Sequence, residues 1–270
     1  MLNVNKFLQR YRYSLILLRE LVITDFKLRY QSSFLGYLWS LLKPLALFAI
    51  LYLVFVRYLP IGGDIPHLPV YILLGIVIWT YFSEVTNNGV SSIVGKGDLL
   101  RKINFPKYVI VLAGSFSALI NLAINLLVVV AFMIFTGVPF MGSMLLIPLI
   151  IIELFVFALG LAFLLSALFV KLRDINYIWE VLMQGAFYGT PIIYAIDILP
   201  IKVQQIIILN PVAQMIQDIR YMMITHETHT IGTVYGNEWM RLVPIGIVVA
   251  FAIISAWYFK KRSRYFAEEI

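Results

Sequence analysis

The sequence predicts an all-α integral membrane protein with six transmembrane helices, an N-terminal amphipathic interface helix and short re-entrant helices between spans five and six. The chain of 270 residues is 61% hydrophobic and only 13% charged, whereas soluble domains contain roughly 25% charged residues. Its length accommodates about six spans, since one span needs about 20 mostly apolar residues. We expect a single transmembrane domain over 1–270, divided into an interface helix (1–34), a six-span bundle (35–260) and a cytoplasmic tail (261–270).

Residues 5–30 are predicted to form the interface helix. Apolar residues recur there at steps of three and four, namely Leu8, Tyr11, Leu15, Leu18, Val22 and Phe26. The basic residues Arg12, Arg19 and Lys27 lie mostly off this stripe. This pattern is typical of a helix that lies in the membrane interface. A plain juxtamembrane anchor explains it equally well, and the sequence leaves both open.

Six apolar segments are the expected spans. They are Leu35–Val56, Pro69–Glu84, Tyr108–Phe135, Met144–Val170, Tyr177–Ile196 and Leu242–Tyr258. Pro44 lies inside the first span, and Gly189 and Pro191 break the fifth. Proline cannot donate a backbone hydrogen bond, so it bends or ends a helix.

The stretch from Asp197 to Trp239 differs from the spans. Ile206–Leu209 and Val212–Ile216 are largely apolar but too short to cross a bilayer, and Asn210-Pro211 separates them. We predict two short helices that enter the membrane without crossing it, which requires protein or a water-filled cavity around their backbone. The alternative is an ordinary exposed loop, which would not need so many isoleucines.

Basic residues gather in alternate connections. They occur in the N-terminal arm, in the loop between spans two and three, in the loop between spans four and five, and in the C-terminal tail. Those that follow the arm are Lys96, Arg101, Lys102, Lys107, Lys171, Arg173, Lys260, Lys261, Arg262 and Arg264. The segment before span six has only Lys202, Arg220 and Arg241. The positive-inside rule then places both termini in the cytoplasm. The net charge of +7 is explained by this asymmetry, so no nucleic-acid partner is expected.

Two motifs fail on spacing. Gly89…Gly95-Lys96 has five residues between its glycines and Gly97 after the lysine, so it is not a phosphate-binding loop. His226-Glu227-Thr228-His229 is one residue short of a zinc-protease motif. The chain has no cysteine, so it offers no thiolate metal site. We therefore expect neither a metal, nor a cofactor, nor a catalytic site in this chain.

Ionisable residues within or near the spans are costly in lipid and are candidates for function. They are Lys43, Arg57, Glu84, Glu153 and Glu180. Glu153 is the deepest, and we interpret it as an interhelical structural contact. The set contains too few acids, without the alternation that a proton relay across the bilayer would need.

Aromatic residues make up 15% of the chain and are frequent in spans one and five. Those predicted to line a substrate channel are Tyr37, Trp39, Phe48, Tyr52, Phe187, Tyr188 and Tyr194. Ring faces pack well against the C–H faces of sugars, and Tyr and Trp add a polar group. Ordinary helix packing explains any single one of them equally well.

Five motifs together resemble a known family. They are the opening segment Arg29–Trp39 followed by Pro44, then Asn104-Phe105-Pro106, Arg173-Asp174, Pro191-Ile192-Ile193-Tyr194 and Leu209-Asn210-Pro211. Their order and approximate spacing are similar to those of polysaccharide-exporting ABC transporter permeases. These are the membrane subunits that export O-antigen, teichoic acid, capsule and rhamnan-type chains.

The resemblance implies a homodimer of permease chains lining a continuous channel, with two copies of a separate ATPase subunit that binds ATP and Mg. It implies that the loop Ser91–Lys107 contacts the ATPase, for which the coupling candidates are Lys96, Asp98, Leu99 and Leu100. It also implies an anionic lipid-pyrophosphate head at the cytoplasmic face. Lys27, Arg29 and Arg101 are the candidates to meet that head. The positive-inside rule alone, or binding of anionic lipid, explains these cations as well.

The expected function is therefore the channel subunit of an ATP-driven exporter of an undecaprenyl-linked polysaccharide in the bacterial cytoplasmic membrane. Three alternatives are an exporter of a drug or small lipid, a membrane-embedded glycosyl- or acyltransferase, and a secondary transporter. The transferase lacks a credible catalytic constellation here. Secondary transporters usually show internal repeats, and the two halves of this chain show no convincing similarity.

Overall fold

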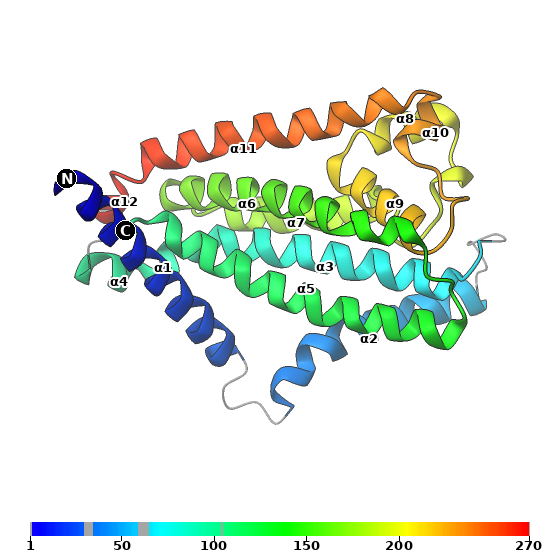
Figure 1. Ribbon diagram of the computed structural model, residues 1–270, viewed down its shortest axis with the longest axis horizontal. Coiled ribbons are helices and arrows are strands. Elements are labelled where there is room, and N and C mark those ends of the chain that lie inside the picture. Colours follow the sequence, from blue (N-terminus) through cyan, green and yellow to red (C-terminus); the bar gives the residue numbers. More distant parts are fainter. Residues whose placement is uncertain (1, 30–34, 59–64, 104, 270) are drawn as a thin grey trace.

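The computed structural model describes residues 2–29, 35–58, 65–103 and 105–269. In these ranges the chain is helical and contains no β-strand. The helices form one elongated bundle (Figure 1). Both termini lie at one end of it, together with α4 (Gly97–Lys102) and α12 (Phe266–Glu269), and three short helices cover the other end.

Four helices in the described part of the chain are long and apolar enough to cross a membrane. They are α3 (Leu68–Ser92), α5 (Tyr108–Thr136), α6 (Ile147–Lys171) and α11 (Leu242–Arg262). They confirm helices at the predicted spans two, three, four and six. α3 continues eight residues beyond the predicted end at Glu84, because its core-facing side stays apolar or small through Val85, Gly89 and Val90.

The predicted spans one and five are built from shorter pieces. In the first, α2 (Trp39–Tyr52) follows the 3₁₀ turn η1 (Gly36–Leu38) and leads into the π-helical turn η2 (Leu53–Tyr58). In the fifth, α7 (Ile175–Gly189) has 15 residues. The predicted break of this span at Gly189 and Pro191 is confirmed, because α7 ends at Gly189. Thr190 is extended, with φ −101° and ψ 138°, because Pro191 disfavours the helical conformation in the residue before it.

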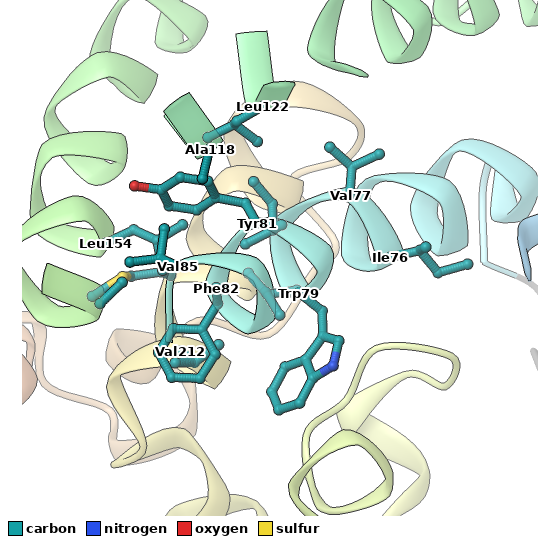
Figure 2. Packing of buried hydrophobic residues seen from close by; sticks show 14 of the residues in the cluster. Ile76, Val77, Trp79, Tyr81, Phe82, Val85, Ala118, Leu122, Leu154 and Val212 are labelled. Atoms are coloured by element: carbon teal, nitrogen blue, oxygen red, sulfur yellow. The ribbon is translucent and has the colours of Figure 1, made fainter. Parts of the chain in front are cut away.

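α3 is the central helix of the bundle. It packs against α5 and α6, and also contacts α2, α7 and α9. Figure 2 shows Tyr81 directed toward Ala118 and Leu122 of α5, while Trp79 projects from another side of α3. Gly89 lies directly against Ala162 of α6: a Cβ at Gly89 would be 2.6 Å from the Ala162 Cβ. α6 in turn packs against α11, so α11 and α2 lie on opposite sides of the bundle (Figure 1).

α1 (Leu2–Arg29) confirms the predicted N-terminal helix and packs against α5. Its packed face differs from the predicted stripe. Ser14, Leu17, Leu18 and Leu21 are buried or partly buried, whereas Leu15 is 63% exposed. The packed face follows the same helical period with a different phase, because the position of α5 decides it. The side chains of Leu8, Tyr11 and Phe26 lie outside the described set.

Three short helices form the end opposite the termini, namely α8 (Ile201–Ile208), α9 (Pro211–Met223) and α10 (Ile231–Tyr235). The Asn210 side chain accepts a hydrogen bond of 3.0 Å from the Val212 N–H and so caps α9. The predicted pair of helices separated by Asn210-Pro211 is confirmed, and each helix is longer than predicted. The remaining 3₁₀ turns are η3 (Val94–Lys96), η4 (Gly142–Leu146), η5 (Ile196–Ile198) and η6 (Glu238–Arg241).

Candidate functional site: a polar groove along the bundle

A groove of about 530 Å³ runs between α2, α3, α5 and α7. We call it the polar groove. Its polar lining comes from hydroxyl, amide and charged side chains, which are Ser40, Lys43, Thr80, Ser83, Glu84, Asn87, Asn88, Asn121 and Asn125. Two of the helices that supply them, α3 and α5, are candidate spans. A polar surface on helices of this kind is costly in lipid unless it faces protein or a water-filled path.

Hydrogen bonds connect α5 to α3 and α2 across the floor of the groove. Asn121 Nδ2 donates to Glu84 Oε1 at 2.9 Å. Asn125 Nδ2 donates to the carbonyl of Asn121 at 2.8 Å and to that of Ser40 at 3.3 Å. Asn121 Oδ1 is buried without a hydrogen-bond partner among the described residues. The Asn121 amide is thus held in a fixed position by its donated hydrogen bond, and its carbonyl oxygen can still accept one from a ligand.

Three aromatic rings also line the polar groove, namely Trp39, Trp79 and Phe187. The rings of Trp79 and Phe187 meet edge to face, with centroids 5.9 Å apart. Trp39 is 52% exposed and so offers a ring face to whatever fills the groove. Amides that bind hydroxyls, beside aromatic faces that pack on C–H groups, suit a polar, ring-shaped substrate.

The other predicted channel aromatics lie elsewhere. Phe48 is buried and packs against Tyr52 and Phe132 at centroid distances of 5.7 and 5.8 Å. Tyr188 is exposed beside Phe187, and its carbonyl accepts a hydrogen bond of 3.2 Å from the Tyr194 hydroxyl. The side chain of Tyr37 lies outside the described set. The structure therefore brings Trp39 and Phe187 together in the polar groove, but not Phe48 and Tyr52.

The asparagines and Trp79 were not singled out from the sequence. A signal for them exists: Asn121 and Asn125 are four residues apart on α5, and Asn87 and Asn88 follow Ser83 by one turn on α3. Such steps place side chains on one helix face. Two polar faces on two apolar helices would have predicted a shared polar surface between them.

The predicted ATPase-contacting residues lie at the end of the bundle that holds both termini. Lys96 Nζ forms an ion pair of 2.9 Å with Asp25 of α1. On α4, Asp98 is exposed, Leu99 is half-buried and Leu100 is buried. The ion pair connects the interface helix directly to the predicted coupling segment.

The cations predicted to meet a lipid-pyrophosphate head are only partly described. Lys27 and Arg101 are exposed, on α1 and α4 respectively. The side chain of Arg29 lies outside the described residues. Lys107, which directly precedes α5, donates to the Ser263 carbonyl and faces the Phe266 ring. Burial lowers the pKa of Lys107, and the nearby Glu268 carboxylate partly opposes this.

A buried arginine organises the opposite end of the bundle. Arg220 of α9 is fully buried, and its guanidinium donates to the backbone carbonyls of Tyr71, Pro191 and Ile192. It also donates to Gln217 Oε1 at 3.0 Å and lies 3.6 Å from the centre of the Tyr71 ring. We call this arrangement the arginine clamp. It joins α9 to the start of α3 and to the segment that follows α7.

Comparisons of the sequence with known proteins identify the family. Residues 16–224 match the sequence model of the ABC-2 type transporter family. The chain is similar to two O-antigen export system permease proteins RfbA from Klebsiella pneumoniae, with 34% and 32% identity over 210 residues, covering 76% of this chain and 80% of each relative. A protein of the same name from Myxococcus xanthus is 28% identical over the full length of both chains.

Proposed function

Since this chain belongs to the ABC-2 type transporter family, we propose that it is the channel subunit of an ATP-driven exporter that moves a lipid-linked polysaccharide across the bacterial cytoplasmic membrane. Family membership makes it a multi-pass membrane protein and a transport component rather than an enzyme, and it implies a partner ATPase subunit. The relatives are named O-antigen export permeases. That name supports a glycan as the substrate of this chain.

The polar groove is the observation that carries the proposal. It combines hydroxyls, amides and three aromatic rings on helices that are otherwise apolar. A small apolar substrate would need none of these amides. A glycan offers hydroxyls for Asn87, Asn88 and Asn121 and C–H faces for Trp39.

The assembly that follows is a homodimer of this chain with two ATPase subunits, which bind ATP and Mg. In this dimer the polar grooves of two copies line one path. The basic connections support an orientation with both termini in the cytoplasm. α2 with η2, and α7 with the segment after it, then serve as the first and fifth of six spans, and α8–α10 lie at the outer mouth.

The coupling route runs through the end that contains the termini. We assign ATPase contact to Lys96, Asp98, Leu99 and Leu100, with the ion pair between Lys96 and Asp25 transmitting movement to α1. Lys27, Arg29 and Arg101 lie on the same side by this orientation. They are suited to a pyrophosphate head, since a charge-assisted hydrogen bond needs a cation of this kind.

The test replaces two exposed groove amides at once, as Asn87→Leu with Asn88→Leu. Both side chains are exposed, so the exchange removes hydrogen-bonding groups without disturbing the core. We expect surface glycan to fall by about 30-fold, because two lost hydrogen bonds of about 1 kcal/mol each amount to about 2 kcal/mol. The measurement is the amount of glycan on cells in which this chain replaces the chromosomal copy, with co-purification of the ATPase recorded in parallel.

Asn176→Leu is the matched control, since Asn176 is exposed on α7 and does not line the polar groove. It should export at the wild-type level. Normal export by the double variant, at normal abundance, would show that the polar groove is not the glycan path. Normal export by cells that lack this chain altogether would reject polysaccharide export itself.

A further inference from the structure

A second cavity, of about 450 Å³, lies between α6, α9 and α11, away from the polar groove. Most of its wall is aliphatic and includes Leu149, Ile152, Val156, Met222, Ile245 and Val249. Leu149, Ile152 and Val249 are also exposed on the outer surface of the bundle. The volume lies in the range of about 300–1,000 Å³ that is typical of small-molecule pockets. The cavity therefore opens toward the lipid-facing side of two candidate spans.

One part of the cavity wall is charged. Glu153 of α6 projects into it, with Asp218 of α9 and Arg241 of η6 as its electrostatic neighbours. Arg241 Nη2 donates to Asp218 Oδ1 at 3.2 Å, and Gln214 Nε2 donates to Asp218 Oδ2. Asp218 is thus paired, while the two carboxylates and one guanidinium leave the group with an excess of one negative charge when Glu153 is ionised.

Three polar atoms of this group are buried and have no hydrogen-bond partner among the described residues. They are Glu153 Oε1, Gln214 Oε1 and Arg241 Nε. Gln214 is only 1% exposed and lines the cavity. Buried polar groups are nearly always paired, because an unpaired group loses its hydration without compensation. Two acceptors and one donor in a single cavity therefore specify a complementary ligand.

The geometry points to a binding site for a phospholipid with a primary ammonium group, of the phosphatidylethanolamine class. Its ammonium donates to Glu153 Oε1 and Gln214 Oε1 and lies beside the Glu153 carboxylate as its counter-charge. Its phosphate accepts from Arg241 Nε, and an acyl chain lies along the aliphatic wall. A choline headgroup has no N–H donor for the two acceptors. A phosphatidylglycerol headgroup has the same phosphate but no ammonium to lie beside the Glu153 carboxylate.

The test measures which lipids the chain retains. The full chain is reconstituted in vesicles of equal parts phosphatidylethanolamine, phosphatidylcholine and phosphatidylglycerol, extracted in mild detergent and examined by native mass spectrometry. We expect phosphatidylethanolamine to be enriched about tenfold over the other two lipids. This preference corresponds to about one charge-assisted hydrogen bond. Soluble glycerophosphoethanolamine in large excess should not displace the lipid, because it lacks the acyl chain that fills the aliphatic part.

Two variants distinguish binding of the lipid headgroup from binding of its acyl chain. Glu153→Gln should remove the preference for phosphatidylethanolamine, while Val249→Trp, which fills the aliphatic part, should lower retention of lipid of any class. Glu180→Gln is the matched control, since Glu180 is exposed on α7 and does not line this cavity. Thermal unfolding of each variant shows whether it is folded, so loss of preference in a folded Glu153→Gln supports the site.

Three results would overturn the proposal. One is equal retention of the three lipids by the wild type. Another is an unchanged preference in Glu153→Gln, and the third is the absence of retained lipid, with the cavity occupied by water alone. Displacement of the retained lipid by glycerophosphoethanolamine would also overturn it, and would show that the cavity binds free amines rather than a lipid. None of these results depends on whether the chain exports a glycan.

Discussion

At the scale of single residues, the arginine clamp depends on a glycine as well as on Arg220. A Cβ at Gly75 would lie 2.5 Å from Arg220 Nη2 and 2.8 Å from the Ile192 carbonyl oxygen. Only glycine leaves room for the guanidinium between α3 and the segment after α7. The sequence could not reveal this, because Arg220 reads there as one of three basic residues in a partly polar stretch. Its burial depends on Tyr71, Pro191 and Ile192, which are distant in sequence.

We predict that Arg220→Met lowers the free energy of unfolding by about 3 kcal/mol or more, since three carbonyls lose a charged donor. Arg220→Lys should also destabilise the fold, because an ammonium cannot reproduce the planar fork of a guanidinium. The measurement is thermal unfolding in detergent. Arg173→Met is the control, as Arg173 is exposed and should change stability by no more than about 0.5 kcal/mol. An Arg220→Met variant as stable as the wild type would show that the clamp is dispensable.

At the scale of elements, the contact between α3 and α6 determines how the core is assembled. Gly89 and Ala162 bring the two backbones close together, since a Cβ at Gly89 would be 2.7 Å from the Ala162 Cα. Small residues allow this approach between membrane helices. α3 then lies between α5 and α6, with α11 beyond α6.

We predict that Gly89→Ala lowers the free energy of unfolding by about 1–3 kcal/mol, because the extra methyl group forces α3 and α6 apart. Gly114→Ala on α5 is a matched control. No atom lies within 4 Å of a Cβ at that position, so the exchange should be neutral or stabilise the helix by up to about 1 kcal/mol. Equal melting temperatures for the two variants would contradict the role of the close approach. Both temperatures come from the same detergent-solubilised preparation.

The helices were more predictable than their faces. Long apolar runs determine α3, α5, α6 and α11, because the bilayer requires them whatever their neighbours are. The packed face of α1 was not predictable, since Leu15 and Leu18 are equally apolar and only the position of α5 distinguishes them. The end of α7 could be anticipated from Gly189 and Pro191, but not the extended path that follows.

The candidate site was less predictable than the helices. Trp39 and Phe187 were anticipated as channel residues, whereas the amides that accompany them were missed. Asn121 and Glu84 are hydrogen-bonded partners 37 residues apart in the chain, and neither alone indicates a groove. Only the packing of α5 against α3 creates the shared polar surface.

At the scale of the whole molecule, the two ends of the bundle differ in character. One end has both termini, α4 and α12, and the other has α8–α10 (Figure 1). The chain has no cysteine, so single cysteines can report on each end without background labelling. Asp98 on α4 and Phe140 between α5 and α6 are exposed positions at opposite ends of α5.

We predict that a membrane-impermeant maleimide labels Phe140→Cys in intact spheroplasts, and labels Asp98→Cys only after the membrane is permeabilised. The reason is the excess of basic residues in the connections on the Asp98 side. The unmodified cysteine-free chain is the control for non-specific labelling. The reverse pattern would invert the proposed orientation and with it the assignment of the ATPase-contacting end.

The arginine clamp also has a consequence for biogenesis. Arg220 follows Tyr71 by 149 residues and Ile192 by 28. At about 5–20 residues per second of synthesis, Arg220 is added about 7–30 s after Tyr71. During this interval α3 lacks the guanidinium that holds it to the segment after α7. A nascent chain cut short before α9 has no donor at this position for the carbonyls of Pro191 and Ile192. We expect membrane proteases that degrade incomplete chains to cleave this end first. Completion of the last third of the sequence would then protect the first third from degradation.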